Sequence, residues 1–451
     1  MMEIEKVVFD FLNCHYSSHS PLLLALSGGP DSLALLHVLL AYRQKNPMTL
    51  GIIHIDHGWR EESKEEAEKL QKLAESLGLP FHLKRIIEKK PKGSNLEDFA
   101  RSERLSFFKA TCLHHGYVAL LTAHHADDQA ETVLKRVLEG ASLPALKGIS
   151  PVERSHGFEI WRPFLSLSKK EIEKWLKKHE LEGFFDKTNE DTKFLRAKFR
   201  KEILPDLSKK FGKNIHFGLT KIGEEARELK EYLEERLAEP LKGVVKGPLG
   251  VYLDLAQNGF LHPFEMKYLL KAFCLQVNFS PSIDTLETIL SLIRGKTANK
   301  QVAQGQKILY IDRGKIFCPL PLSVPFSNPL LESEGNLRSG PWSATLSPYK
   351  GENLQKLGWM EAWKGEVQVA LPFGQYSLKG FSSNVPYHTH SSLAKWWSDA
   401  KVPFFLRNRV PVLWKNNGPF YEFLTGKIPP IGAQSPELLL RLKCSGSKEP
   451  Y

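Results

Sequence analysis

Cysteines are few in this sequence, and their positions argue against the common cysteine-based sites. The 451 residues include five, which are scattered along the chain and form no C-x-x-C pair. An odd number of widely spaced cysteines supports neither a zinc site, nor an iron–sulfur cluster, nor a disulfide framework. The five are Cys14, Cys112, Cys274, Cys318 and Cys444.

Long apolar runs are missing too. No stretch approaches the ~20 apolar residues that a membrane-spanning helix needs. Residues 1–16 contain early acids and no cationic region followed by an apolar core, so they do not resemble a signal peptide. A Walker A loop is also absent, because the Gly-Lys-Thr at 295–297 has Leu290 where that motif needs glycine. We therefore expect a cytoplasmic protein with no membrane partner.

Negative charge is in deficit. The chain has 62 Lys and Arg against 51 Asp and Glu, which gives a formal net charge of +11. Such an excess favours a polyanionic partner, although a basic surface alone is weak evidence. The length allows two or three domains.

What the sequence does contain is organised around residues 22–40. The apolar run 22–26 predicts a buried parallel strand, and 33–40 predicts a helix. Between them, Ser-Gly-Gly-Pro-Asp-Ser forms a small-residue turn at a helix N-terminus, which suits an anion such as phosphate. Asp31 would repel a bare phosphate, so we expect it to act through Mg²⁺. An ordinary glycine-rich turn is the alternative. The candidate nucleotide-binding residues are Ser27, Gly28, Gly29, Pro30, Asp31 and Ser32.

The rest of the N-terminal half predicts an α/β domain. Apolar runs at 49–56, 81–87 and 117–123 alternate with helical patterns, which is typical of a doubly wound parallel sheet. Ligands of such sheets lie at the carboxyl ends of the strands. Polar clusters follow three of the strands, at 27–32, 54–60 and 124–129. We therefore add His54 and Asp56 to the nucleotide site, with satisfied strand-end residues as the alternative.

Two predicted helices each carry a pair of like-charged residues that are three positions apart. Asp128 and Glu131 share one helical face, which favours Mg²⁺ or a substrate amine over a purely structural helix-terminal acid. Arg101 and Arg104 share one face of another predicted helix. Their two guanidiniums could neutralise phosphate oxygens, and a solvated charged face is the alternative.

Residues 193–213 carry eight Lys or Arg against two acids, with Phe194, Phe199 and Phe211 interleaved. Aromatic side chains among cations suit an RNA backbone and stacked bases, whereas a solvated helix face is the usual meaning of such a run. We favour RNA contact. The candidate RNA-binding residues in this segment are Arg196, Lys198, Arg200 and Lys201.

The hexapeptide 27–32 resembles the SGGxDS signature of the PP-loop ATP pyrophosphatases. With the other segments, in order and spacing, the first half of the chain is similar to the tRNA(Ile)-lysidine synthetases of that superfamily. Residues 392–426 again resemble their C-terminal domain, which helps to hold tRNA, and this adds Lys395 and Arg407. The chain departs from the family at Ala197, where asparagine is typical, and at Ala394, where lysine is common. The matching segments are 27–32, 54–60, 95–101 with Arg104, 122–132, 162–164, and 186–189 with Arg196, Arg200 and Pro205.

The resemblance implies an adenine nucleotide alpha hydrolase-like fold and an ATP-dependent ligase. Its reaction attaches free L-lysine to C2 of the wobble cytidine in the CAU anticodon of tRNA(Ile), through an adenylated intermediate. AMP and pyrophosphate are released, and the tRNA then reads AUA as isoleucine. ATP and Mg²⁺ are the implied cofactors, Asp31, Asp128 and Arg104 the catalytic candidates, and a second copy of the chain a candidate partner. Asp128 could serve either the lysine amine or Mg²⁺.

We expect three domains: a catalytic domain over 1–215, a mostly helical domain over 216–325 and a small α+β tRNA-binding domain over 345–445. A proline-rich segment at 319–341 separates the last two. Trp396 and Trp397 are expected in the core. Two other functions remain open: another PP-loop tRNA-modifying enzyme, and a non-catalytic RNA-binding protein with a relic nucleotide site.

Overall fold

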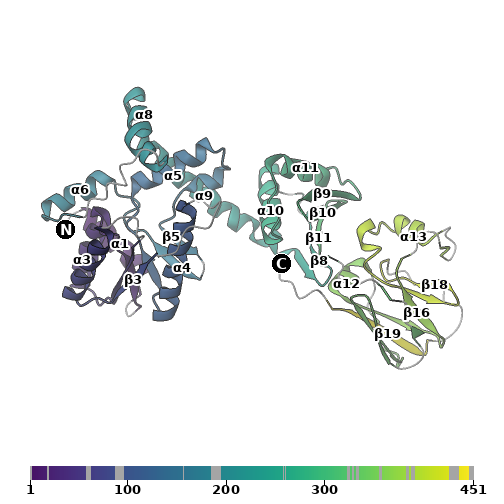
Figure 1. Cartoon of the computed structure of the whole chain (residues 1–451). Helices are drawn as coiled ribbons and strands as arrows, with labels where there is room; N and C mark the ends of the chain where they lie inside the picture. Colours follow the sequence, from purple (N-terminus) through teal and green to yellow (C-terminus); the bar gives the residue numbers. More distant parts are fainter. Residues whose placement is uncertain are drawn as a thin grey trace. The chain divides into compact units, whose positions relative to one another are not determined.

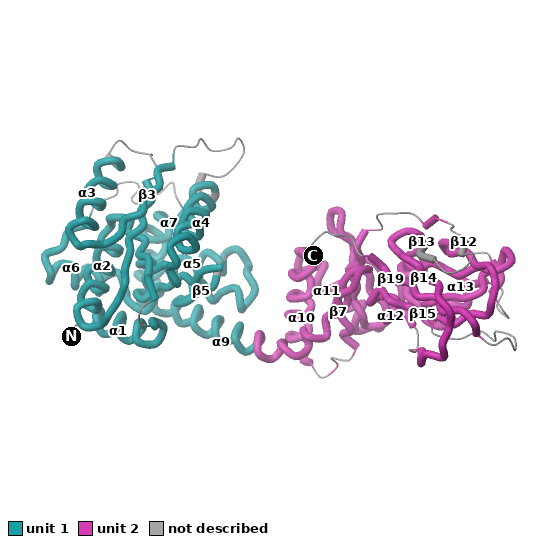
Figure 2. Tube along the Cα trace, turned by 90° about the horizontal axis from the view of Figure 1, so that it is seen from below, with its two compact units in different colours: residues 1–232 teal, residues 233–451 magenta. Residues whose placement is uncertain are grey.

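The computed structural model divides into two compact units, residues 1–232 and 233–451 (Figure 2). No helix among its described residues is long and apolar enough to cross a membrane. The described residues are 3–17, 20–56, 62–86, 96–155, 157–183, 195–256, 259, 261–321, 326–327, 330–331, 335–354, 358–381, 385–387, 392–425 and 436–445.

The first unit is built on a six-stranded sheet with the order β3-β2-β1-β4-β6-β5. Five strands are parallel, and β5 pairs antiparallel with β6 at the edge. The predicted doubly wound parallel sheet is thereby confirmed, and the β5–β6 hairpin is an addition. The strands are β1 (Leu22–Ala25), β2 (Leu50–Asp56), β3 (Phe81–Arg85), β4 (Ala119–Leu121), β5 (Val152–Ser155) and β6 (Phe158–Trp161).

Helices cover both faces of this sheet (Figure 1). Successive strand residues point to opposite faces, so Leu22 and Leu24 pack with α1, α2, α3 and α6, while Leu23 packs with α4. The helices are α1 (Glu3–His15), α2 (Pro30–Arg43), α3 (Glu62–Ser76), α4 (Leu96–His115), α5 (Ala126–Leu138) and α6 (Lys169–Lys178).

A second group of helices follows α6. Phe199 and Leu204 pack against the apolar face of α5, which anchors this group to the first unit. Burial of Phe199 makes the prediction that it stacks on RNA wrong, whereas Phe211 is 68% exposed and Phe194 lies outside the described residues. The elements are α7 (Leu195–Lys198), the π-helical turn η3 (Phe199–Ile203), α8 (Leu204–Phe211) and α9 (Ile215–Lys242).

The second unit contains more strands than the sequence suggested. Where a mostly helical domain was predicted over 216–325, the structure also has a five-stranded antiparallel sheet of order β7-β8-β11-β10-β9. The sheet depends on the pairing of β8 with β11, for example Val251 opposite Cys318, which joins segments far apart in the sequence and has no local signal. Its elements are β7 (Val244–Gly247), β8 (Gly250–Asp254), α10 (Pro263–Gln276), α11 (Ile283–Arg294), β9 (Lys300–Gln304), β10 (Lys307–Asp312) and β11 (Lys315–Pro319).

Two four-stranded sheets complete the second unit, with the orders β12-β16-β17-β18 and β13-β14-β19-β15. Their shared core contains Trp342, Trp363 and Trp397, and Trp396 packs on it partly buried, so the prediction of two core tryptophans is confirmed. The elements are β12 (Leu330–Leu331), β13 (Gly335–Ser339), β14 (Trp342–Pro348), α12 (Trp359–Lys364), β15 (Glu366–Leu371), β16 (Tyr376–Lys379), α13 (Leu393–Asp399), β17 (Val412–Lys415), β18 (Gly418–Tyr421) and β19 (Leu438–Cys444).

Candidate active site

The predicted nucleotide-binding turn joins the end of β1 to the start of α2. Gly28 has a φ of 84°, a left-handed conformation that glycine adopts without strain. Two serines brace the turn: Ser27 Oγ accepts from Gly29 N–H at 3.3 Å, and Ser32 Oγ donates to Gly29 O at 2.9 Å. Pro30 occupies the first helical turn, where a missing N–H is harmless. The result is a rigid strand–turn–helix whose backbone suits an anion.

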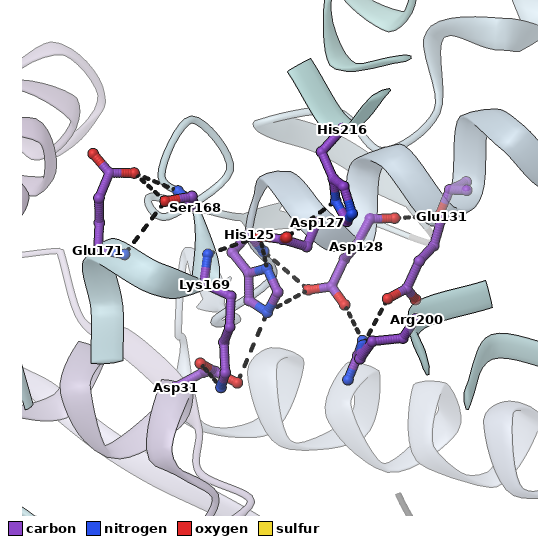
Figure 3. A network of polar contacts seen from close by, with 11 residues as sticks. Asp31, His125, Asp127, Asp128, Glu131, Ser168, Lys169, Glu171, Arg200 and His216 are labelled. Carbon is purple, nitrogen blue, oxygen red and sulfur yellow. Dashed lines mark hydrogen bonds and ion pairs between the residues drawn. The ribbon is translucent and has the colours of Figure 1, made fainter. Parts of the chain in front are cut away.

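Lys169 lies directly beside this turn. Ser168 caps α6 in a capping box with Glu171, which fixes the start of the helix. From there, Lys169 Nζ donates to Asp31 Oδ1 at 2.5 Å, and Lys169 N–H donates to Asp127 Oδ2 at 2.7 Å (Figure 3). One residue thus joins the turn to the acidic start of α5.

His125 lies at the centre of the site, between three carboxylates (Figure 3). Its Nε2 is 3.9 Å from Asp31 Oδ2 and 3.5 Å from Asp128 Oδ2, and its Nδ1 is 3.5 Å from Asp127 Oδ2. Burial opposes the charged form, yet the contact with Asp127 and the charges of Asp128 and Asp31 raise the pKa of His125 overall. The imidazolium is therefore stabilised by its neighbours.

The two aspartates at the start of α5 stay ionised although they are shielded from solvent. Burial raises the pKa of Asp127, but contacts with His125, His216 and the Lys169 N–H lower it well below its usual range. His216 Nδ1 lies 3.1 Å from Asp127 Oδ1. Burial likewise opposes ionisation of Asp128, and the neighbouring histidines with the His125 N–H, which donates to Asp128 at 3.0 Å, lower its pKa.

Arg200 turns toward this acidic cluster. Its Nε donates to Glu131 Oε1 at 2.7 Å and one terminal nitrogen donates to Asp128 Oδ1 at 3.1 Å. Glu131 is only 3% exposed, and burial raises its pKa against the opposing effect of Arg200. The predicted i, i+3 pair of acids therefore shares one guanidinium. In this structure Arg200, predicted to bind tRNA, is engaged within the site.

Arginines form a positive zone near the acidic cluster. Burial and the charges of Arg101 and Arg196 lower the pKa of Arg104, a predicted catalytic residue. Burial, with added repulsion from nearby arginines, lowers the pKa of His124 to about 4 against the charge of Asp128. His124 is therefore neutral at pH 7, and the zone is suited to an anion.

His54 and Asp56 at the end of β2 make structural contacts. His54 Nδ1 lies 2.8 Å from Leu26 O, which joins the ends of two neighbouring strands. Burial lowers the pKa of His54, partly offset by that contact. Asp56 is nearly buried and lies 3.1 Å from Arg85 Nε. Residues 57–60 of the same predicted cluster lie outside the described residues.

Comparison with known proteins identifies the family to which this site belongs. Residues 2–207 match the family described as the PP-loop domain. The chain is 39% identical over 420 residues to the tRNA(Ile)-lysidine synthase of Protochlamydia amoebophila, and the match covers 92% of this chain and 91% of that protein. The chain belongs to the tRNA(Ile)-lysidine synthase family.

A second relative carries the same name. The lysidine synthase of Chlamydia muridarum is 35% identical, over 65% of this chain and 91% of its own length. Among solved structures, the tRNA thiolase NcsA of Methanococcus maripaludis has a TM-score of 0.43 and 17% identity, covering 50% of this chain and 78% of its own. The predicted family, PP-loop fold and class of enzyme are confirmed: a lysidine synthase that uses ATP and acts on tRNA.

The predicted tRNA-binding residues of this lysidine synthase differ in their surroundings. Arg196, Lys198 and Lys201 are exposed on α7 and η3. In the second unit, Lys395 is exposed, whereas the Arg407 guanidinium is buried and donates to Ser398 Oγ at 3.1 Å and to a nearby backbone carbonyl at 3.2 Å. Arg407 thus stabilises its own domain, and its role toward tRNA stays a prediction.

The carboxylate of Asp31 fits a Mg²⁺ ion whose other ligands come from the substrate and from water. No group of three His, Cys, Asp or Glu among the described residues forms a metal site by itself. Mg²⁺ commonly binds through one or two carboxylates plus substrate phosphates, with water completing its octahedron. Asp31, 27% exposed at the phosphate turn, meets that requirement.

Sequence reasoning did not single out three residues of this site, and it gave a fourth a different role. Lys169 contacts Asp31 across 138 residues of chain, so no local pattern could reveal the pair. His125 was read as part of a polar cluster, and its central position depends on how β1 and α5 meet. Arg200 was assigned to tRNA, and His216 lay beyond the expected catalytic boundary. The capping box at Ser168 was the one available signal, because it fixed where α6 begins.

Proposed function

We propose that this chain attaches free L-lysine to C2 of the wobble cytidine in the CAU anticodon of tRNA(Ile), with ATP cleaved to AMP and pyrophosphate. One observation supports it above the others. His125 Nε2 lies within 4 Å of both Asp31, at the phosphate turn, and Asp128, in the acidic pair. A site for ATP and a site for an amine are therefore adjacent, as a two-step ligase requires.

In the first step, O2 of the cytidine attacks the α-phosphate of ATP and pyrophosphate leaves. The turn at 27–32 binds the leaving pyrophosphate through backbone N–H groups, and Asp31 is the candidate ligand of Mg²⁺. Bound Mg²⁺ would offset the charge of the phosphates. Arg104 and the arginines near it are the candidates to stabilise the negative charge that develops in transfer, because they bring several positive charges together.

In the second step, the ε-amine of lysine attacks C2 of the adenylated cytidine and AMP leaves. The amine arrives as an ammonium, for which Asp128 is an ionised and largely shielded partner. Once paired, Asp128 is also the candidate acceptor of the proton that the amine must lose. Arg200, held by Asp128 and Glu131, offers a guanidinium for the α-carboxylate of the amino acid. The alternative, Asp128 as a second Mg²⁺ ligand, predicts failure of the first step instead.

The tRNA is an extended polyanion, and exposed cations of both units are the candidate contacts. In the first unit these are Arg196, Lys198 and Lys201, and in the second unit Lys395. The wobble base lies in a single-stranded loop, so its extrusion into the site costs little base pairing. Association of two copies and a cytoplasmic location are further proposals; light scattering of the purified chain tests the first.

Lysine incorporation tests the function directly. Purified protein with ATP, Mg²⁺ and labelled L-lysine should modify a tRNA(Ile) transcript with a CAU anticodon and release AMP and pyrophosphate in equal amounts. A transcript with a GAU anticodon is the control and should accept no lysine. Transfer of sulfur, or ATP-independent tRNA binding with no AMP formed, would favour the two alternative functions and overturn the proposal.

A further inference from the structure

The start of α6 and the segment that follows this helix both contact the proposed phosphate-binding turn. At the start, Lys169 Nζ donates to Asp31 Oδ1 at 2.5 Å. Just beyond the end, Gly183 lies against the backbone of the turn: a Cβ on Gly183 would come 2.6 Å from Pro30 N and 2.8 Å from Pro30 Cα. Such distances leave no room for any side chain, so the segment after α6 packs directly on the turn.

A purely structural salt bridge explains the first contact poorly. The apolar face of α6 already buries Ile172, Trp175 and Leu176 in the core, which holds the helix in place. The ion pair is not buried, since Lys169 and Asp31 retain 30% and 27% of their side-chain exposure. Partly exposed pairs contribute little to stability. Lys169 is therefore available to solvent and to a ligand at the turn.

Binding of ATP at the turn would bring negative charges together, and a nearby cation would offset their repulsion. ATP brings several negative charges to the place where Asp31 already contributes one. An ammonium has three N–H donors, and Asp31 Oδ1 accepts one of them. The remaining donors can bind phosphate oxygens while the pair with Asp31 persists. The hydrogen bond from Lys169 N–H to Asp127 fixes the backbone from which the side chain reaches.

We propose that Lys169 is a substrate-binding residue that holds the β- and γ-phosphates of ATP and the pyrophosphate released from them. This deepens the proposed function and rests on ATP binding at the turn. A residue that binds the β- and γ-phosphates affects the affinity for pyrophosphate but not the affinity for AMP. A residue that only stabilises the fold has no reason to distinguish these two ligands.

Calorimetric titration with magnesium pyrophosphate, ATP and AMP tests this signature. Lys169→Met should weaken binding of pyrophosphate and of ATP by at least ~10-fold, the usual effect of losing one charge-assisted hydrogen bond. Binding of AMP should change less than about twofold. Lys169→Arg should recover part of the loss. Lys170→Met is the matched control, because Lys170 is the neighbouring, exposed lysine in the same helical turn, and it should leave all three affinities unchanged.

A measurement on the unmodified chain keeps the test independent of how the variants fold. Pyrophosphate should protect Lys169 from acetylation, read by peptide mass spectrometry, whereas AMP should not, and Lys170 should react equally in all samples. Any of three results would overturn the assignment. They are an unchanged pyrophosphate affinity in folded Lys169→Met, an equal loss of AMP and pyrophosphate binding in that variant, and no protection of Lys169 from acetylation by pyrophosphate. If pyrophosphate binds as described but no lysine is incorporated, the proposed function fails while this inference stands.

Discussion

Replacing Asp128 by asparagine separates the two chemical steps. The substitution keeps the shape of the side chain, and the asparagine oxygen can still accept the His125 N–H that Asp128 accepts at 3.0 Å. It removes the negative charge that pairs with Arg200 at 3.1 Å and that would meet the lysine ammonium. Loss of a charge-assisted hydrogen bond at a shielded site costs about 1.5–3 kcal/mol, or roughly 10- to 150-fold in the step that uses it.

We expect that loss in lysine attack and not in adenylation. Single-turnover reactions with α-labelled ATP, quenched over time, should show adenylated tRNA accumulating in Asp128→Asn, with the lysine concentration needed for half-maximal rate raised. Glu139→Gln, an exposed acid just past the end of the same helix, is the control and should behave as the unmodified chain. If adenylation falls first and no intermediate accumulates, Asp128 serves Mg²⁺, and the reasoning about the amine is refuted.

Four other outcomes follow from the structure. Asp31→Asn should cut adenylation by at least ~10²-fold while tRNA binding stays nearly intact, measured by AMP release and filter binding. Lys198→Ala with Lys201→Ala should flatten the slope of log affinity against log salt, which is near −0.7 for each contacted phosphate in single strands; an unchanged slope would mean a solvated face. His125 has a raised pKa in the folded state, so its contribution to stability is complete below the unfolded pKa of about 6.5 and is lost as pH rises through the folded pKa. Urea titrations from pH 5 to 9 should show this decline in the unmodified chain and a smaller one in His125→Asn. Glu422→Gln should destabilise the second unit by about 1–3 kcal/mol, because this fully buried carboxylate accepts from both Trp396 and Trp397, and an amide nitrogen would face an indole N–H. Tryptophan fluorescence in denaturant measures the loss of stability, and a change below about 0.5 kcal/mol would contradict this reasoning.

Local patterns predicted the strand, turn and helix over 22–40 because each of these parts has a local cause. An apolar run forms β1, glycine permits the left-handed φ at Gly28, and Pro30 starts α2. The helix that begins after Ser168 was predictable for the same reason, since a capping box acts over three residues.

Contacts across the chain were not predictable in this way. Arg200 reads as one more cation in a basic run, and only packing of Phe199 against α5 turns the neighbouring guanidinium toward Glu131. The same packing removed Phe199 from the predicted RNA surface. In the second unit, β8 pairs with β11 from a segment far along the chain, so the local sequence did not reveal the five-stranded sheet.

The acidic cluster owes its form to pairing between opposite charges. Each carboxylate of this cluster has a basic neighbour: Lys169 for Asp31, His125 and His216 for Asp127, and Arg200 for both Asp128 and Glu131. Four acids so close together would otherwise repel one another and take up protons. A lysine ammonium that reaches Asp128 therefore competes with Arg200, which lowers its affinity for the carboxylate. In the proposed second step, the ammonium would replace Arg200 at Asp128, and the guanidinium nitrogen released there would be the candidate donor to the carboxylate of the amino acid. A free amino acid carries both charges, whereas a simple amine carries one, so the pairing favours the zwitterion over a bare amine.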